Sequence, residues 1–276
     1  MNQTPVLLCM DAGNTLVKWC LFDNLQQNFS NAMNFSSQPT SELKPFENAC
    51  TVLGDLLSSV LSDLDNPVAA VLLCNVLGPD FERAVRRLCE QHHVPLHVLS
   101  VNTKVPMRSA YENPSQLGKD RWAACLAVSQ NSHAQVNLLV SFGTATTVDA
   151  VVDQAGWQHL GGFIVPGLHT MFDSLHVNTA ELPPVRLGVP ASHLDSGFWP
   201  GTTQRAIGEG VGRMQAAFVQ SLVNQLAHQY EQTPVVWFSG GFAHQMVMYF
   251  PQAHLLEHAV FKGLVFDYQC SVQGRS

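Results

Sequence analysis

Charged side chains are scarce in this chain. Asp, Glu, Lys and Arg make up 13% of its 276 residues, and Lys and Arg together number 14. The formal net charge at pH 7 is −7, and the basic residues form no cluster. Because proteins that bind nucleic acids neutralise phosphates with clustered Lys and Arg, we expect no nucleic-acid partner.

Membrane, disulfide and metal-binding signals are also missing. No apolar run reaches transmembrane length, and the first residues do not form a secretion signal. The seven cysteines form no Cys-x-x-Cys pair, and the twelve histidines form no His-Glu-x-x-His motif. Cysteines within apolar runs are typical of small core residues in a reducing compartment. We therefore expect a cytoplasmic protein with no membrane partner, and its 46% hydrophobic content predicts a compact core in two domains.

Two segments about a domain apart are built alike. One runs from Val6 through a turn at residues 11–15, and the other from Val136 through a turn at residues 141–147. In each, an apolar strand ends in a turn with Gly and Thr, and a second strand follows. Such turns offer backbone N–H groups and hydroxyls to phosphate oxygens. One hairpin alone is often only a hairpin, but two facing each other would clamp a nucleotide, as in actin-like ATPases and sugar kinases.

The order of predicted elements agrees with that architecture. In the first half we expect strands in 5–22 and near 28–36, a helix over 41–64, a strand over 68–74, a helix over 79–91 and a strand over 95–99, then a polar loop to residue 116. In the second half we expect a helix over 119–130, strands over 136–141, 145–152 and 157–165, helices over 167–177 and 203–230, a strand over 234–238, and helices over 241–249 and 259–270. This is an α/β pattern of two ribonuclease-H-like lobes, 1–116 and 117–276, with the active-site cleft between them. The last helix, 259–270, could pack back on the first lobe.

Asp11 and Lys18 are candidate site residues in the first hairpin. Asp11 ends an apolar strand, where a carboxylate is costly unless a cation or hydrogen bonds meet it. A magnesium ion that accompanies a phosphate is one partner for it, and an Asx-turn within the hairpin is the structural alternative. Lys18 either contacts phosphate or lies on an exposed strand face, and the sequence does not choose between them.

The densest polar cluster covers residues 111–121. Gly118 permits close approach of a ligand, and Lys119 and Arg121 bring positive charge. Asp120 falls in the first turn of the following helix, whose dipole keeps a carboxylate ionised, although acidic residues are common there for structural reasons alone. In a loose phosphoryl-transfer transition state the proton leaves late, so an aspartate that orients the hydroxyl is sufficient.

Taken together, these segments resemble the type III pantothenate kinases, the family that opens coenzyme A biosynthesis. The matching motifs, in the family's order, are Asp11 to Thr15 with Lys18, Tyr111 to Arg121, Gly143 to Asp149, Gly161 to Gly167, Thr179 to Pro183, and Thr203 to Gly210. The resemblance implies an actin-like (ASKHA) fold, transfer of the ATP γ-phosphate to the primary hydroxyl of pantothenate, and a homodimer.

The resemblance also implies roles for individual residues. The expected ATP contacts are Asp11, Ala12, Gly13, Asn14, Thr15, Leu16, Val17, Lys18 and Thr144. The expected pantothenate contacts are Tyr111, Gly118, Lys119, Asp120, Arg121 and Thr203, with Asp120 as the catalytic proton acceptor. Arg121 suits the pantothenate carboxylate, which a guanidinium grips with two hydrogen bonds. Mg²⁺ is expected with ATP, and Asp11 is its candidate ligand.

One position departs from the family. An aspartate that binds an activating potassium or ammonium ion usually precedes the Phe-Gly-Thr-Ala-Thr-Thr run, and here that residue is Ser141. A hydroxyl is a neutral ligand, so the sequence does not decide whether a monovalent cation binds here. The expected phosphoryl transfer does not depend on this residue. The alternatives are another actin-like small-molecule kinase, which would lack the cluster at residues 111–121, and a nucleotide-gated accessory protein, against which the intact Asp11, Asp120 and Thr144 argue.

Overall fold

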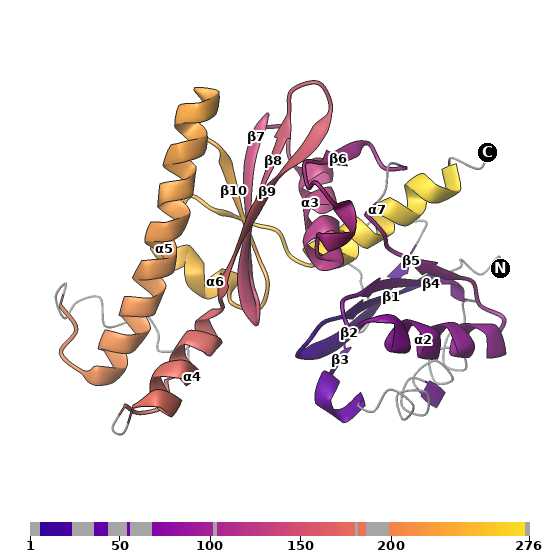
Figure 1. Ribbon diagram of the computed structural model, residues 1–276, viewed down its shortest axis with the longest axis horizontal. Helices are drawn as coiled ribbons and strands as arrows, with labels where there is room; N and C mark the ends of the chain where they lie inside the picture. The colour runs from indigo at the N-terminus through magenta and orange to yellow at the C-terminus, as the bar shows by residue number, and fades with distance from the viewer. Residues whose placement is uncertain are drawn as a thin grey trace. The chain divides into compact units, whose positions relative to one another are not determined.

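The computed structural model describes two compact α/β units, each built on one mixed sheet (Figure 1). The described residues are 6–23, 36–43, 54–55, 68–101, 104–179, 182–185 and 199–273. Unit 1 comprises Met1–Pro106, Glu112–Ala127 and Val260–Ser276, and unit 2 comprises Met107–Tyr111 and Val128–Ala259. The two units interleave along the sequence, and the simpler division into 1–116 and 117–276 stays a prediction.

Unit 1 contains the first predicted hairpin. Its strands are β1 (Val6–Ala12), β2 (Leu16–Asp23), β3 (Ser36–Pro39), β4 (Val68–Asn75) and β5 (Leu96–Val98), in the sheet order β3-β2-β1-β4-β5. β1, β2 and β3 pair antiparallel, and β4 and β5 continue the sheet in parallel from β1. This is the predicted ribonuclease-H-like arrangement of an antiparallel trio followed by parallel crossovers.

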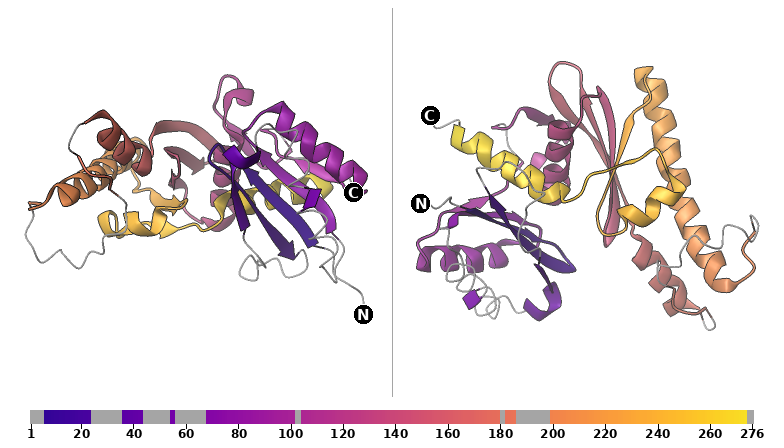
Figure 2. Two further views of the ribbon diagram at one scale, coloured as in Figure 1. Left: turned by 90° about the horizontal axis from the view of Figure 1, so that it is seen from below. Right: turned by 180° about the vertical axis from the view of Figure 1, so that it is seen from behind.

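Helices cover both faces of the first sheet. α2 (Pro79–Gln91) lies on one side, and α7 (Ala259–Gln273) lies on the other (Figure 2). The residues that α2 buries recur at helical spacing, which directs one apolar stripe at the sheet: Phe81, Ala84, Val85, Leu88 and Cys89. Because both faces are covered, β1 and β4 are apolar along almost their whole length.

Two predictions in the first half fall mainly outside the described residues. Of the expected helix over 41–64, the structure describes the end of a 3₁₀ helix, η2 (Thr40–Leu43), and residues 54–55. Of the expected strand near 28–36, it describes residue 36, where β3 begins.

Unit 2 repeats the antiparallel trio. Its strands are β6 (Met107–Ser109), β7 (Val136–Phe142), β8 (Ala145–Asp153), β9 (Trp157–Pro166), β10 (Val235–Ser239) and β11 (His254–Leu255), in the order β11-β10-β7-β8-β9-β6. β7, β8 and β9 pair antiparallel, and β10 runs parallel to β7. The helices are α4 (Leu168–Asn178), α5 (Thr203–Tyr230) and the short α6 (Ala243–Met246), which a 3₁₀ turn, η5 (Val247–Tyr249), extends.

The prediction of a loop over residues 102–116 is wrong in part. Residues 107–109 form β6, which pairs parallel with the start of β9, and residues 114–116 form a 3₁₀ turn, η3 (Pro114–Gln116). A three-residue strand is too short to show an alternating pattern, and its pairing partner lies far along the chain.

α3 (Lys119–Asn131) agrees with the predicted helix over 119–130. In unit 1 it packs so closely on α7 that a side chain at Gly263 would collide with the Ala123 carbonyl oxygen. None of the helices in the described part of the chain combines the length and the apolar character that a membrane span requires.

Candidate functional site

The turn between β1 and β2 is fixed by hydrogen bonds from two directions. The Gly13 N–H donates to the Leu16 carbonyl oxygen at 3.0 Å. From η2, the Thr40 hydroxyl donates to the Gly13 carbonyl oxygen at 2.7 Å, and the Thr40 N–H donates to the Thr15 carbonyl oxygen at 2.9 Å. The side chains of Asn14 and Thr15 remain exposed at the tip. A rigid turn with exposed polar groups can receive phosphate oxygens without first being ordered.

Asp11 lies beside this turn, between Lys18 on β2 and Cys74 on β4 in the strand register. Burial raises the pKa of the Asp11 carboxyl to about 6, although the Lys18 ammonium lowers it, and the Asp120 carboxylate raises it further. Within the described residues, the Asp11 carboxylate accepts no hydrogen bond, which disfavours the Asx-turn alternative. A carboxylate in these surroundings is stabilised by a cation.

Asp120 belongs to the first turn of α3, where the helix dipole favours a negative charge. A Cβ atom at Gly118 would lie 2.7 Å from the Asp120 Oδ1, which is too close for a normal contact. Glycine at this position therefore avoids a collision with the carboxylate. Burial raises the pKa of the Cys74 thiol well above its usual value; the charges of Asp11 and Asp120 raise it further, and Lys119 lowers it. The charges of Asp11, Lys119 and Asp120 therefore all act on Cys74, near the end of β4 in unit 1.

Arg121 follows in the same helix and is buried, with 6% of its surface exposed. Lys18, by contrast, is exposed on β2. Unit 1 thus brings together Asp11, Lys18, Lys119 and Asp120, of which β1 and β2 supply two and the first turn of α3 supplies two.

The second hairpin turn, in unit 2, is held by one hydrogen bond within the turn and by two from the start of α4. The Gly143 N–H donates to the Ala145 carbonyl oxygen at 3.1 Å. The Thr144 carbonyl oxygen accepts from the Gly167 N–H at 3.2 Å and from the Thr170 hydroxyl at 2.9 Å, both at the start of α4. The Thr144 side chain stays exposed. A side chain at Gly167 would collide with the carbonyl groups of Gly143 and Thr144, so this glycine serves close packing.

A third segment approaches the same turn. Gly240, between β10 and α6, has φ +89°, a conformation that glycine adopts readily. A side chain there would collide with the backbone of Phe142. The starts of α4 and α6 therefore both pack, backbone to backbone, on the turn at residues 142–144.

Ser141 lies in a row of hydroxyl groups across the sheet of unit 2. It pairs with Ser239 on β10 and with Thr147 on β8. Laterally paired residues point to one face of a sheet, and the next position in the row, on β9, is Ile164. Three of these four positions offer a hydroxyl oxygen, and none offers a carboxylate.

Two further predicted contacts belong to unit 2. Tyr111 is half-buried after the end of β6, and Thr203 is exposed in the first turn of α5. The preceding residue, Thr202, caps that helix and accepts a hydrogen bond from the Arg205 N–H at 3.3 Å.

A buried pair, Asp149 and His159, escaped the sequence analysis. The His159 Nε2 lies 2.8 Å from the Asp149 Oδ1, and the two side chains are 1% exposed or less. Asp149 falls within a matched motif, but nothing in the strand pattern singles out His159. A β-bulge decides which face of the sheet His159 occupies.

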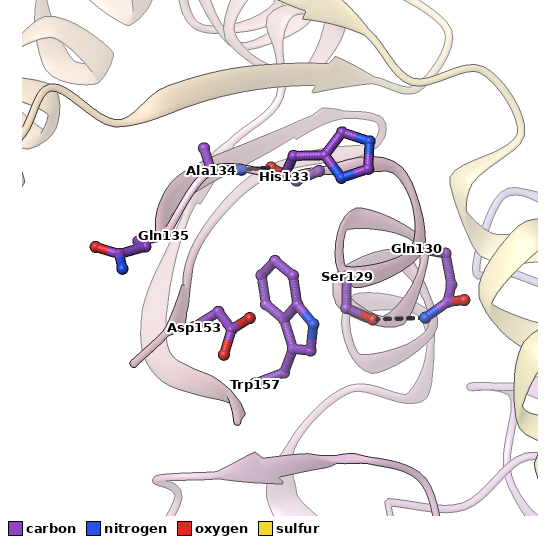
Figure 3. Close-up of a pocket in the computed structure, with 8 residues that line it drawn as sticks. Ser129, Gln130, His133, Ala134, Gln135, Asp153 and Trp157 are labelled. Carbon is purple, nitrogen blue, oxygen red and sulfur yellow. Dashed lines mark hydrogen bonds between the residues drawn. The ribbon is translucent and has the colours of Figure 1, made fainter. Parts of the chain in front are cut away.

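Two surface pockets of unit 2 lie apart from these residues. One, of about 340 Å³, is lined by polar groups that include His133, Asp153 and the Trp157 indole (Figure 3). The other, of about 410 Å³, lies between α5 and the strands β8 and β9. Neither is lined by a residue that the sequence assigns to ATP or pantothenate.

This chain is similar to known type III pantothenate kinases. The family model described as type III pantothenate kinase matches residues 7–225. A type III pantothenate kinase of Janthinobacterium sp. (strain Marseille) is 32% identical over 247 residues, which cover 88% of each chain. Another, of Nitrosospira multiformis, is 30% identical over 270 residues, covering 95% of this chain and 91% of the relative.

Solved structures show the fold. A conserved Baf family protein from Campylobacter jejuni superposes with a TM-score of 0.56 at 18% identity, covering 97% of this chain and 98% of the other. The ROK hexokinase from Thermus thermophilus superposes with a TM-score of 0.52 at 14% identity, covering 98% and 99%. The predicted α/β fold of the actin-like kinases is confirmed.

Proposed function

The chain belongs to the type III pantothenate kinase family, and we propose that it transfers the γ-phosphate of ATP to pantothenate, yielding 4'-phosphopantothenate, the first step of coenzyme A biosynthesis. The observation that carries the proposal beyond family membership is the meeting of Asp11 and Asp120 in unit 1. The two residues belong to different family motifs, and the charge of Asp120 raises the pKa of Asp11. A kinase needs one carboxylate for the metal and one for the acceptor hydroxyl.

In this proposal the first hairpin and Thr144 bind ATP. The backbone and side chains of residues 11–18 receive phosphate oxygens, and Lys18 adds positive charge. Asp11 would hold the Mg²⁺ that accompanies ATP, because its desolvated carboxylate has a raised pKa, which a bound cation would lower again. The ion would neutralise part of the negative charge of the phosphates.

Asp120 is the proposed proton acceptor. The primary hydroxyl oxygen of pantothenate bonds to the γ-phosphorus while the bond from that phosphorus to the bridging oxygen of ADP breaks. The hydroxyl proton passes to the Asp120 carboxylate. Gly118 keeps space beside this carboxylate for the acceptor, since a Cβ at 118 would fill it.

The remaining substrate contacts are proposed from the family motifs. Tyr111, Gly118, Lys119 and Thr203 contact pantothenate, and the Arg121 guanidinium grips its carboxylate. Arg121 is well suited to this, because a charge-assisted pair is stronger where water is excluded.

Three finer proposals concern the cation, assembly and location. We propose weak binding of K⁺ or NH₄⁺ at Ser141, because the hydroxyl row offers neutral ligands.

We propose a homodimer, which the exposed apolar side chains of Phe163, Ile164 and Met214 support. We also propose a cytoplasmic location, in keeping with the free thiols of the described cysteines.

A coupled assay of ADP release tests the proposed function. Pantothenate is compared with a small panel of sugars, at saturating ATP and Mg²⁺. We expect rapid ADP release with pantothenate and background release with each sugar. Release with a sugar instead would identify a different actin-like kinase, and ATP binding without release on any acceptor would identify an accessory protein.

A further inference from the structure

A chain of hydrogen bonds leads from the interior of unit 2 to Tyr111. It begins at Asp149 on β8, whose Oδ1 lies 2.8 Å from the His159 Nε2 on β9. The other ring nitrogen of His159, Nδ1, lies 3.4 Å from the Ser109 hydroxyl at the end of β6. That hydroxyl oxygen accepts a hydrogen bond from the Tyr111 N–H at 3.2 Å.

A β-bulge aims His159 along this chain. The pairing of β8 with β9 shifts between Ala150 and the next residue, which leaves Leu160 as an extra residue on β9. Gly161, at the bulge, has φ +126°, a conformation that side chains rarely adopt. Without the extra residue, His159 would point to the opposite face from Asp149. Bulges that redirect one side chain are common next to functional sites.

The donors and acceptors in the chain match when the hydrogen of neutral His159 is on Nε2. Nε2 then donates to the Asp149 carboxylate, and Nδ1 accepts the hydroxyl hydrogen of Ser109. The Ser109 oxygen in turn accepts from the Tyr111 N–H. Each hydrogen bond thereby determines whether the next polar group acts as donor or acceptor.

Two more contacts bind the same short segment to His159. The Ala110 N–H donates to the His159 carbonyl oxygen at 2.9 Å. The Tyr111 ring packs on the imidazole with its centroid 5.7 Å away and an angle of 31° between the planes. The backbone and the ring of Tyr111 are therefore both held by His159 or by the serine bonded to it.

Fold stability alone does not account for the buried pair. Removing Asp149 and His159 from water costs free energy that a packed apolar pair would avoid. Such a cost is typical of polar groups that hold another residue in place.

We propose that Asp149, His159 and Ser109 are positioning residues that set the orientation of Tyr111 for pantothenate. This rests on the proposed function, in which Tyr111 contacts pantothenate. The three residues touch neither substrate, and they act through the segment that joins β6 to Tyr111.

Ser109→Ala is the direct test, because it removes the link to Tyr111 and leaves the Asp149–His159 pair in place. We expect the KM for pantothenate to rise about fivefold, the effect of one lost hydrogen bond. The KM for ATP and the melting temperature should stay at wild-type values. Ser109→Thr keeps the hydroxyl and should restore the KM, and Ser221→Ala, the same change on the exposed face of α5, should have no effect.

A double-mutant cycle with Tyr111→Ala shows whether Ser109 acts through Tyr111. In the Tyr111→Ala background, Ser109→Ala should raise the KM for pantothenate no further. Additive effects, or an unchanged KM in Ser109→Ala beside a raised KM in Tyr111→Ala, would overturn the positioning role and leave the proposed function intact. Wild-type protein that does not phosphorylate pantothenate would overturn the proposed function, and the positioning role with it.

Discussion

At the scale of single residues, two carboxylates in unit 1 occupy different surroundings. Asp11 is desolvated at the end of β1, whereas Asp120 faces the dipole of α3. The sequence predicted each of them from its own neighbours, one at the end of an apolar strand and one in a first helical turn. Their proximity could not be predicted from spacing, because it depends on how α3 packs near the ends of β1 and β4.

The raised pKa of Asp11 predicts a pH-dependent stability. The folded protein binds this proton more tightly than the unfolded chain, since the pKa rises from 3.8 to about 6. The group therefore destabilises the fold increasingly between about pH 4 and pH 6, and fully above that. Asp11→Asn should raise the free energy of unfolding by about 3 kcal/mol at pH 7.5, since one pKa unit is worth about 1.4 kcal/mol, and by only about 0.5 kcal/mol at pH 4.

Urea denaturation without ATP or Mg²⁺ at the two pH values measures this difference. A matched change at an exposed carboxylate, Asp173→Asn in α4, should show no such dependence. An Asp11→Asn effect of equal size at both pH values would mean that the desolvated carboxylate is not the cause.

Ser141 predicts weak dependence on a monovalent cation. Charge count strongly tunes the affinity of oxygen ligands for hard ions, and the row at Ser141 offers hydroxyls but no carboxylate. In a titration with K⁺ in buffer free of Na⁺ and NH₄⁺, Ser141→Asp should need less K⁺ for half-activation than the wild type. Mg²⁺ should be required by both.

Ser174→Asp, which adds the same charge at an exposed position of α4, controls for charge alone and should titrate like the wild type. If the wild type requires K⁺ absolutely and at low concentration, and Ser141→Asp does not strengthen the binding, another carboxylate holds the ion.

At the scale of elements, unit 2 depends on close backbone packing at one turn. Gly240 has a positive φ, and a side chain there would collide with the Phe142 backbone, whereas the neighbouring Gly241 faces open space. Gly240→Ala should therefore lower the free energy of unfolding by more than about 2 kcal/mol. Gly241→Ala should change it by less than about 0.5 kcal/mol.

Chemical denaturation of the two variants, which differ by one position, gives the comparison. Equal stabilities would show that the junction of β10 and α6 relaxes away from the turn at residues 142–144.

The elements of this fold were predictable where their patterns are long. The strands β1, β2, β7, β8 and β9 and the long helix α5 follow from runs of apolar residues and from helical spacing. β6 was not predictable, since three residues in a polar stretch carry no period. The bulge at Gly161 was not predictable either, because a glycine in a strand does not reveal which residue will be left unpaired. The orientation of His159 depends on that bulge, which is why sequence reasoning missed it.

At the scale of the whole molecule, the proposed homodimer needs a surface. Along α5, Val211 and Leu222 are buried in unit 2, but Met214 is 54% exposed. On β9, Phe163 is 52% exposed and its ring packs against Phe218 of α5. An exposed apolar patch on neighbouring elements is typical of a subunit interface.

Met214→Glu should therefore shift the protein from dimer to monomer in sedimentation velocity. Val272→Glu, at a similarly exposed apolar position on α7, should leave the dimer intact. A wild-type protein that is fully active as a monomer at assay concentration would contradict the homodimer.

The central claim is that Asp120 accepts the proton of pantothenate, and turnover of Asp120→Asn tests it most directly. The control is Asp80→Asn, which changes the second residue of α2 as Asp120→Asn changes the second residue of α3. We predict that Asp120→Asn lowers kcat for pantothenate phosphorylation by about 10²-fold or more, with ATP affinity and melting temperature unchanged, while Asp80→Asn retains full turnover. Turnover of Asp120→Asn at the wild-type rate would contradict the account.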